Sequence, residues 1–276
     1  MDRPPDGALI IAEPAWRAST ADLYVWDRAL GTLSEQPRWL VVQADDDSRT
    51  LSDTAHQILT RYQRLVPRTN SDSSTAVFAK VLSGHQALHD VSLPLVRADY
   101  DHALDVWQWT LRLLPTASLA LQLAALFHDI ERLLSEAQRR IEHTALDYQA
   151  FKNAHAEGGA LLAAEVLGAC GVEQRTIAGV TRLIREHEAP RGPGRAGDAE
   201  LLADADALSF FSLNSPGFAD YYGPEHTERK VRYTLGRMSP RAIRRLSGLR
   251  LREDVARVLA GATRAEAKAA LRQEQA

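Results

Sequence analysis

Apolar side chains recur at helical spacing through most of the chain beyond about residue 98. The segment 101–114 is amphipathic and ends before Pro115, a residue that cannot continue a helix. Ser118 is placed to cap a second helix, over 119–128, whose residues are apolar on nearly every face. A helix that is apolar all round belongs inside a protein, so this one is predicted to be central and buried.

The rest of the chain also has helical patterns, separated by glycine and proline. The predicted helices are 146–169, which stops at Gly171; 173–188, which stops at Pro190; 199–211, capped by Asp198; and three more within 227–276. The apolar, turn-rich segment 210–218 is predicted to be a loop packed on the core, with a place at a pocket mouth as the alternative.

The first 95 residues have a different, mixed pattern of apolar positions. Short apolar runs at 8–12 and 39–42 read as buried strands, and 51–66 has helical periodicity. The sequence therefore predicts a mainly α fold, in which a small α/β region of unknown role, 1–95, precedes a helical domain, 96–276.

Composition and charge limit the kinds of molecule that the protein is expected to bind. The chain has 33 basic and 36 acidic residues, a balance that gives no reason to expect nucleic acid or an anionic membrane. No apolar stretch approaches a membrane span, no signal peptide is apparent, and the single cysteine, Cys170, reads as structural. A cytoplasmic protein with a small-molecule substrate is expected. The segment 230–238 and the arginine-rich helices after it are predicted to cover a site or to form a homodimer contact.

Histidine and aspartate residues stand on successive predicted helices. They are His102, His128, Asp129, His155, His187, Asp204 and Asp206. Imidazole nitrogen and carboxylate oxygen are the ligands expected for ions such as Fe, Mn and Zn. The His128-Asp129 pair closes the apolar helix, so it places polar groups beside a core, where they need partners. Neighbouring residues point about 100° apart around a helix, so the pair can share one ion or bridge two.

A single histidine on a helix is more often hydrogen-bonded or exposed than bound to a metal. The histidines interpreted in that ordinary way are His56, His85, His89, His143 and His226.

The order of the remaining ligands resembles that of the HD-domain superfamily of metal-dependent phosphohydrolases, over residues 98–212. The resemblance rests on Tyr-Asp-His-Ala-Leu at 100–104, Leu-Ala-Ala-Leu-Phe-His-Asp-Ile at 123–130, Ala-His-Ala at 154–156, Leu-Ile-Arg-Glu-His at 183–187, and Ala-Asp-Ala-Asp-Ala-Leu at 203–208. It implies an HD-type helical bundle that holds divalent ions, two of them in some members: Fe, Mn, Mg or Zn.

The resemblance also implies the ligands. His102, His128, Asp129 and a final aspartate match the core set, while His155 and His187 match the extra ligands of two-metal members, in which the paired aspartate bridges the ions. Asp206 stands in the usual Ala-Asp-x-Leu context. Asp204, two residues away, faces elsewhere on a helix, so Asp206 is preferred.

Two cationic residues near these ligands are candidates for phosphate binding. Arg132 stands where many members carry lysine, and a guanidinium is a bidentate phosphate clamp; a surface ion pair with Glu131 or Glu136 is the alternative. Lys152, one turn before His155, could reach the site or simply be solvated. Asp129, Arg132 and Lys152 are therefore the predicted catalytic residues.

Three functions follow from the resemblance. The first is hydrolysis of a nucleotide or another small phosphate ester, although no aromatic run or glycine-rich loop identifies a base. The second is a mixed-valent di-iron oxygenase that cleaves a C–C or C–P bond, because the same six ligands serve that chemistry. The third is a non-catalytic regulatory module, which the retention of six candidate ligands argues against.

Overall fold

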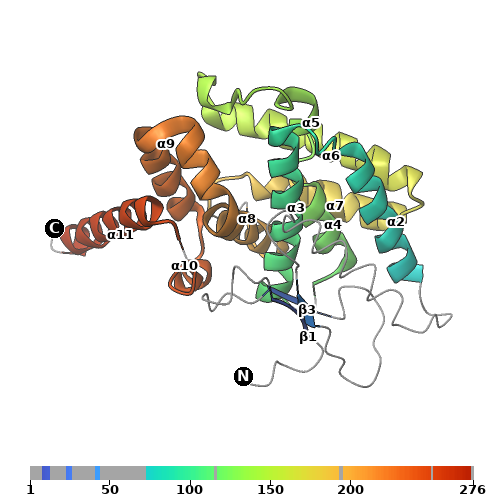
Figure 1. The fold of residues 1–276 in the computed structure, drawn as a ribbon, viewed down its shortest axis with the longest axis horizontal. Helices are drawn as coiled ribbons and strands as arrows, with labels where there is room; N and C mark the ends of the chain where they lie inside the picture. Colours follow the sequence, from blue (N-terminus) through green and yellow to red (C-terminus); the bar gives the residue numbers. More distant parts are fainter. Residues whose placement is uncertain are drawn as a thin grey trace.

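The structure is a computed structural model that describes residues 8–12, 23–26, 41–43, 73–114, 117–192, 195–249 and 251–274. It is mainly helical, as predicted (Figure 1). Three short strands, β1 (Ala8–Ala12), β2 (Leu23–Trp26) and β3 (Val41–Gln43), form a sheet in the order β2-β1-β3. β1 pairs antiparallel with β2 and parallel with β3. The helix expected over 51–66 lies outside the described residues.

The helices follow in a nearly continuous series. The first are α2 (Ser73–Leu88), α3 (Pro94–Leu113), α4 (Leu119–Phe127), α5 (Arg132–Ser135), the 3-10 turn η3 (Glu142–Thr144) and α6 (Tyr148–Ala169). The others are α7 (Gln174–His187), α8 (Asp198–Ser209), the π-helical turn η4 (Phe210–Asn214), α9 (Ser215–Arg237), α10 (Pro240–Leu246) and α11 (Glu253–Glu274). None of these described helices is both long and apolar enough to cross a membrane. The division into two domains stays a prediction, although α2, which precedes residue 95, contributes Phe78 and Val81 to the helical core.

The helix starts follow from local side-chain chemistry. The Ser118 hydroxyl accepts a hydrogen bond from the Leu121 amide at 3.2 Å, so the predicted cap of α4 is confirmed. The Asp147 carboxylate caps α6 in the same way, at 2.9 Å from the Ala150 amide. The predicted cap of α8 was wrong: Asp198 is the first helical residue, and the cap is Gly197, whose φ of 60° favours glycine.

The segment 210–218 is helical rather than the loop that the sequence predicted. The turn η4 continues α8 directly into α9, and it buries Phe210 and Phe211. Pro216 and Gly217, which read as turn residues, lie in the first turn of α9, where a proline loses no helical hydrogen bond. α9 bends later, at Gly223, before continuing from Pro224.

α4 is the centre of the bundle, as its apolar sequence predicted. All of its residues from Leu121 to Phe127 are buried, and it contacts α2, α3, α6, α7 and α8. Gly179 of α7 allows a close approach, because a Cβ there would stand 3.1 Å from the Cβ of Ala120. Cys170 packs against this core, in agreement with a structural role. The His-Asp pair therefore directly follows a helix that is almost entirely buried.

Candidate metal centre

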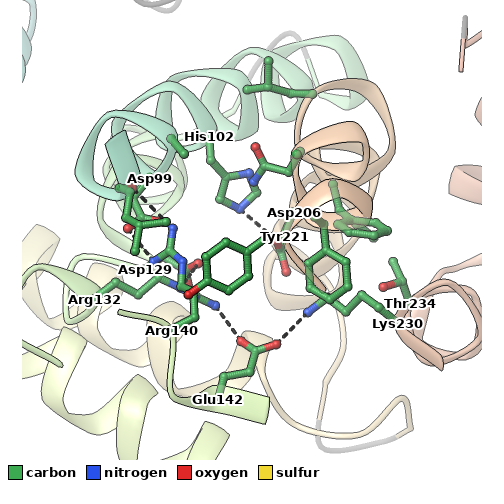
Figure 2. A pocket seen from close by; sticks show the side chains of 18 of the residues that line it. Asp99, His102, Asp129, Arg132, Arg140, Glu142, Asp206, Tyr221, Lys230 and Thr234 are labelled. Atoms are coloured by element: carbon green, nitrogen blue, oxygen red, sulfur yellow. Dashed lines mark hydrogen bonds and ion pairs between the residues drawn. The ribbon is translucent and has the colours of Figure 1, made fainter. Parts of the chain in front are cut away.

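The predicted ligands from five helices meet in one place. They are His102 on α3, His128 and Asp129 directly after α4, His155 on α6, His187 at the end of α7, and Asp206 on α8. The four histidines are at most 5% exposed. Positions more than one hundred residues apart in the chain thus contribute to a single buried cluster, part of which Figure 2 shows.

One half of this cluster consists of His102, His128 and Asp206. The Nε2 atoms of His102 and His128 lie 3.3 Å apart, and Asp206 Oδ1 is 3.2 Å from the first and 3.8 Å from the second. Asp129 Oδ2 is 3.9 Å from His128 Nε2. Ligand atoms around an ion with bonds of about 2.1 Å lie roughly 3.0–3.4 Å apart, so these atoms need only small shifts to share an ion.

The other half is formed by Asp129, His155, His187 and a residue that the sequence analysis missed, Glu188. Asp129, His187 and Glu188 offer ligand atoms that all lie within 4.8 Å of one another. His155 Nε2 lies 2.9 Å from Asp129 Oδ1. Because Asp129 also belongs to a group with His102 and His128, its carboxylate stands between the two halves.

Each of the four histidines is anchored through Nδ1, which leaves Nε2 directed toward the cluster. The Nδ1 atoms of His128 and His187 donate to the carbonyl oxygens of Ala125 and Ile184, at 2.9 and 2.7 Å. The other two anchors are the Ser209 hydroxyl, 2.9 Å from His102 Nδ1, and the Glu131 carboxylate, 2.7 Å from His155 Nδ1. An oxygen partner on one ring nitrogen fixes the ring so that the other can bind a metal.

The structure separates the two candidate aspartates of α8. Asp206 faces His102, whereas the Asp204 carboxylate accepts hydrogen bonds from the backbone amide (2.8 Å) and the hydroxyl of Ser239. Asp204 therefore ties α8 to the start of α10 and is not brought into the cluster.

Arg132 is neither a free phosphate clamp nor a surface residue. Its guanidinium donates to Asp129 Oδ2 at 2.8 Å, to Glu142 at 2.8 Å and to Glu136. Three carboxylates thus hold it at the edge of the site. Glu131, its alternative predicted partner, bonds instead to His155 and Ser135.

Lys152 is buried, so its interpretation as a solvated lysine was wrong. It is 3% exposed, and its ammonium forms an ion pair with Glu188. Arg237, from the end of α9, lies 2.9 Å from the other oxygen of Glu188. The sequence does not predict this contact, because Lys152, Glu188 and Arg237 come from separate parts of the chain.

A cavity of about 360 Å³ opens beside His102, Asp129 and Asp206. Its cationic lining residues are Arg132, Arg140, Lys152, Lys230 and Arg237, and its aromatic ones are Phe210, Phe218, Tyr221 and Tyr222. Phe210 and Phe218 belong to the segment 210–218, whereas Tyr221 and Tyr222 follow it on α9 and were not predicted to line a pocket. The segment 210–218 thus takes the pocket-lining place that was the alternative prediction.

Glu142 joins three elements at the cavity. It accepts hydrogen bonds from Arg132 (2.8 Å), from the Tyr148 hydroxyl (3.0 Å) and from Lys230 (3.2 Å). Figure 2 shows its carboxylate between Arg132 and Lys230.

Comparison with known proteins gives one match. A family model described as a domain of unknown function, DUF4202, matches residues 83–259. The chain belongs to this family. The matched region includes every candidate ligand of the cluster. No significant match is found among curated proteins or among solved structures. Membership of the HD superfamily stays a prediction.

The electrostatics of this DUF4202 domain favour the deprotonated form of four candidate ligands, His128, Asp129, His187 and Asp206. Burial lowers the pKa of His187 to about 4, and it also lowers that of His128. Burial opposes ionisation of both aspartates, but nearby cations hold their pKa values well below the usual range: Arg132, His128 and His155 for Asp129, and His102 and His128 for Asp206.

His102 and His155 differ from these four candidate ligands. Despite burial, the hydrogen bond and charge of Asp206 raise the pKa of His102. The bonds of His155 to Asp129 and Glu131 raise its pKa to about 8, so a metal bound there would displace a proton.

Proposed function

We propose that this protein is a metal-dependent phosphohydrolase of the HD type, which acts on a small phosphate ester through two divalent ions. The observation that carries the proposal is the common anchoring of His102, His128, His155 and His187 through Nδ1, which directs every Nε2 toward Asp129 or its neighbours. Histidines that only fill a core have no reason to share this orientation around buried carboxylates.

The residues fit two ions. His102, His128, Asp129 and Asp206 would hold one, and Asp129 with His155 and His187 would hold the other. The orphaned Nε2 of His187, buried without a hydrogen-bond partner among the described residues, supports the second position. When bound, such ions polarise a phosphoryl oxygen and lower the pKa of water, which is the chemistry that phosphoester hydrolysis needs.

The cations of the cavity favour an anionic substrate. Burial lowers the pKa of Lys152 and Lys230, but Glu188 and Glu142 more than offset that effect, so both pKa values are raised and both side chains stay charged. Fixed positive charges beside two metal ions would bind phosphate and stabilise the negative charge that develops on its oxygens. Neither lysine can serve as a general base near neutral pH.

The aromatic wall gives the cavity a second, apolar surface. Phe210, Phe218, Tyr221 and Tyr222 lie on the side built by η4 and α9. This wall would bind the uncharged part of the ester and exclude water from it. The substrate we propose is therefore a compact molecule with one anionic and one apolar end.

The proposal is tested by incubating the purified chain with Mn²⁺, Fe²⁺, Mg²⁺ or Zn²⁺ and a panel of small phosphate esters, while following phosphate release and oxygen uptake. Metal-dependent phosphate release that is lost in Asp206→Asn supports it. Oxygen uptake without hydrolysis would identify the oxygenase instead. Metal binding without any turnover on a broad panel would favour the regulatory module.

A further inference from the structure

Glu188 is fully buried although it directly follows the last residue of α7. It is 1% exposed, and both of its oxygens face charged groups. Oε1 forms the ion pair with Lys152 and lies 3.6 Å from His187 Nε2, while Oε2 lies 2.9 Å from Arg237 Nη2. A carboxylate is rarely taken this far from water unless it is paired with cations or coordinates a metal ion, and Glu188 has the cations beside it.

His187 gives an independent sign of a missing ligand at the same place. Its Nδ1 donates to the Ile184 carbonyl, so its Nε2 carries the lone pair. That Nε2 is fully buried and has no hydrogen-bond partner among the described residues. It lies in one group with oxygens of Asp129 and Glu188, all within 4.8 Å of one another.

We propose that Glu188 is a ligand of the second ion, together with Asp129, His155 and His187, and that Lys152 and Arg237 position its carboxylate. The inference rests on the proposed two-metal site and concerns a ligand that neither the resemblance nor the family match supplies. A carboxylate has about four lone-pair positions, so Glu188 can bind an ion and still accept from both cations.

This ligand makes the two halves of the centre alike. His102, His128 and Asp206 with the shared Asp129 form one set, and His155, His187 and Glu188 with the same Asp129 form the other. Sets of two imidazoles and two carboxylates suit Mn²⁺ or Fe²⁺, since oxygen ligands favour the harder ions. Three carboxylates against two divalent ions leave the centre positively charged, which agrees with an anionic substrate.

The experiment measures bound manganese per chain after loading the full-length protein with Mn²⁺ and removing free metal, in wild type, Glu188→Gln and Glu186→Gln. Glu186 is the matched control, because it lies on the same helix end and pairs with Arg182 at the surface. We expect two ions in wild type and in Glu186→Gln, and one in Glu188→Gln. The EPR spectrum of Glu188→Gln should change from a coupled pair to a single manganese.

A second variant protects the test against misfolding. Glu188→Asp keeps the charge that Lys152 and Arg237 need but withdraws the carboxylate by one methylene, so the second ion should bind at least about tenfold more weakly. Two ions with a wild-type spectrum in Glu188→Gln, or unchanged affinity in Glu188→Asp, would overturn the role of Glu188 and leave the hydrolase intact. Conversely, the wild type could bind two ions and Glu188→Gln only one, while no ester is hydrolysed. That result would support the role of Glu188 and contradict the proposed hydrolase.

Discussion

The two halves of the proposed metal centre offer the same types of candidate ligand but are supported in different ways. In the half that contains His102 and His128, neutral groups hold the rings: a serine hydroxyl and a backbone carbonyl. In the other half, charges surround the ligands: His155 bonds to Glu131, and Glu188 lies between Lys152 and Arg237. The first half should therefore depend on packing of the core, and the second on the balance of buried charge.

The largest effect is expected from breaking the first half at Asp206. Asp206→Asn should lower metal-dependent turnover by about a thousandfold, because a bound ion supplies several kcal/mol of transition-state stabilisation. Asp204→Asn is the matched control: it should destabilise the fold by about 1–3 kcal/mol through its bonds to Ser239, yet keep both ions. Turnover and metal content are measured for both variants. Loss of metal in Asp204→Asn but not in Asp206→Asn would show that Asp204 is the ligand.

Packing beneath the first half can be weakened without touching a ligand. Leu123 of α4 is fully buried, so Leu123→Ala should lower the free energy of unfolding by about 2–5 kcal/mol. Leu161 on α6 is 61% exposed, and Leu161→Ala should change that free energy by less than about 0.5 kcal/mol. Urea unfolding compares the two variants. Equal losses would contradict the central place of α4.

Removing one cationic side chain from the charged half should lower the stability of the protein more without metal than with it. Lys152→Met leaves Glu188 with Arg237 alone, which should destabilise the metal-free protein by about 1–3 kcal/mol. Bound ions offset the uncompensated carboxylate, so the loss should be smaller after loading. Thermal unfolding with and without Mn²⁺ tests this, and the same loss in both states would show that Glu188 does not face an ion.

The smallest effect concerns pH and a histidine outside the centre. Burial lowers the pKa of His85, which packs against Tyr100 and Phe127, well below 6.5. The unfolded chain therefore binds a proton at higher pH than the folded one, and stability present above pH 6.5 is lost as the pH falls below it. This group contributes up to about 1.4 kcal/mol per pH unit. In His85→Leu the fall in stability from pH 6.5 to 5 should be shallower; parallel curves would contradict the burial of a neutral imidazole.

The parts of the site that the sequence predicts are those fixed by single helices. His128 and Asp129 close a helix that is apolar on nearly every face, so their place beside the core follows from α4 alone. The charged support does not follow from the sequence, because Glu142 meets Lys230 from 88 positions away. The sequence already favours Asp206 over Asp204, but the role of Asp204 does not follow from it, because its partner Ser239 lies 35 positions further on.

Whether the cluster binds metal is decided by the metal content of the wild-type chain after loading with Mn²⁺ or Fe²⁺ under anaerobic conditions. We expect two ions per chain, bound tightly enough to survive removal of free metal. A chain that is folded and retains no ion after this treatment would contradict the proposed metal centre, because the convergence of His102, His128, His155 and His187 on Asp129 would then serve packing alone.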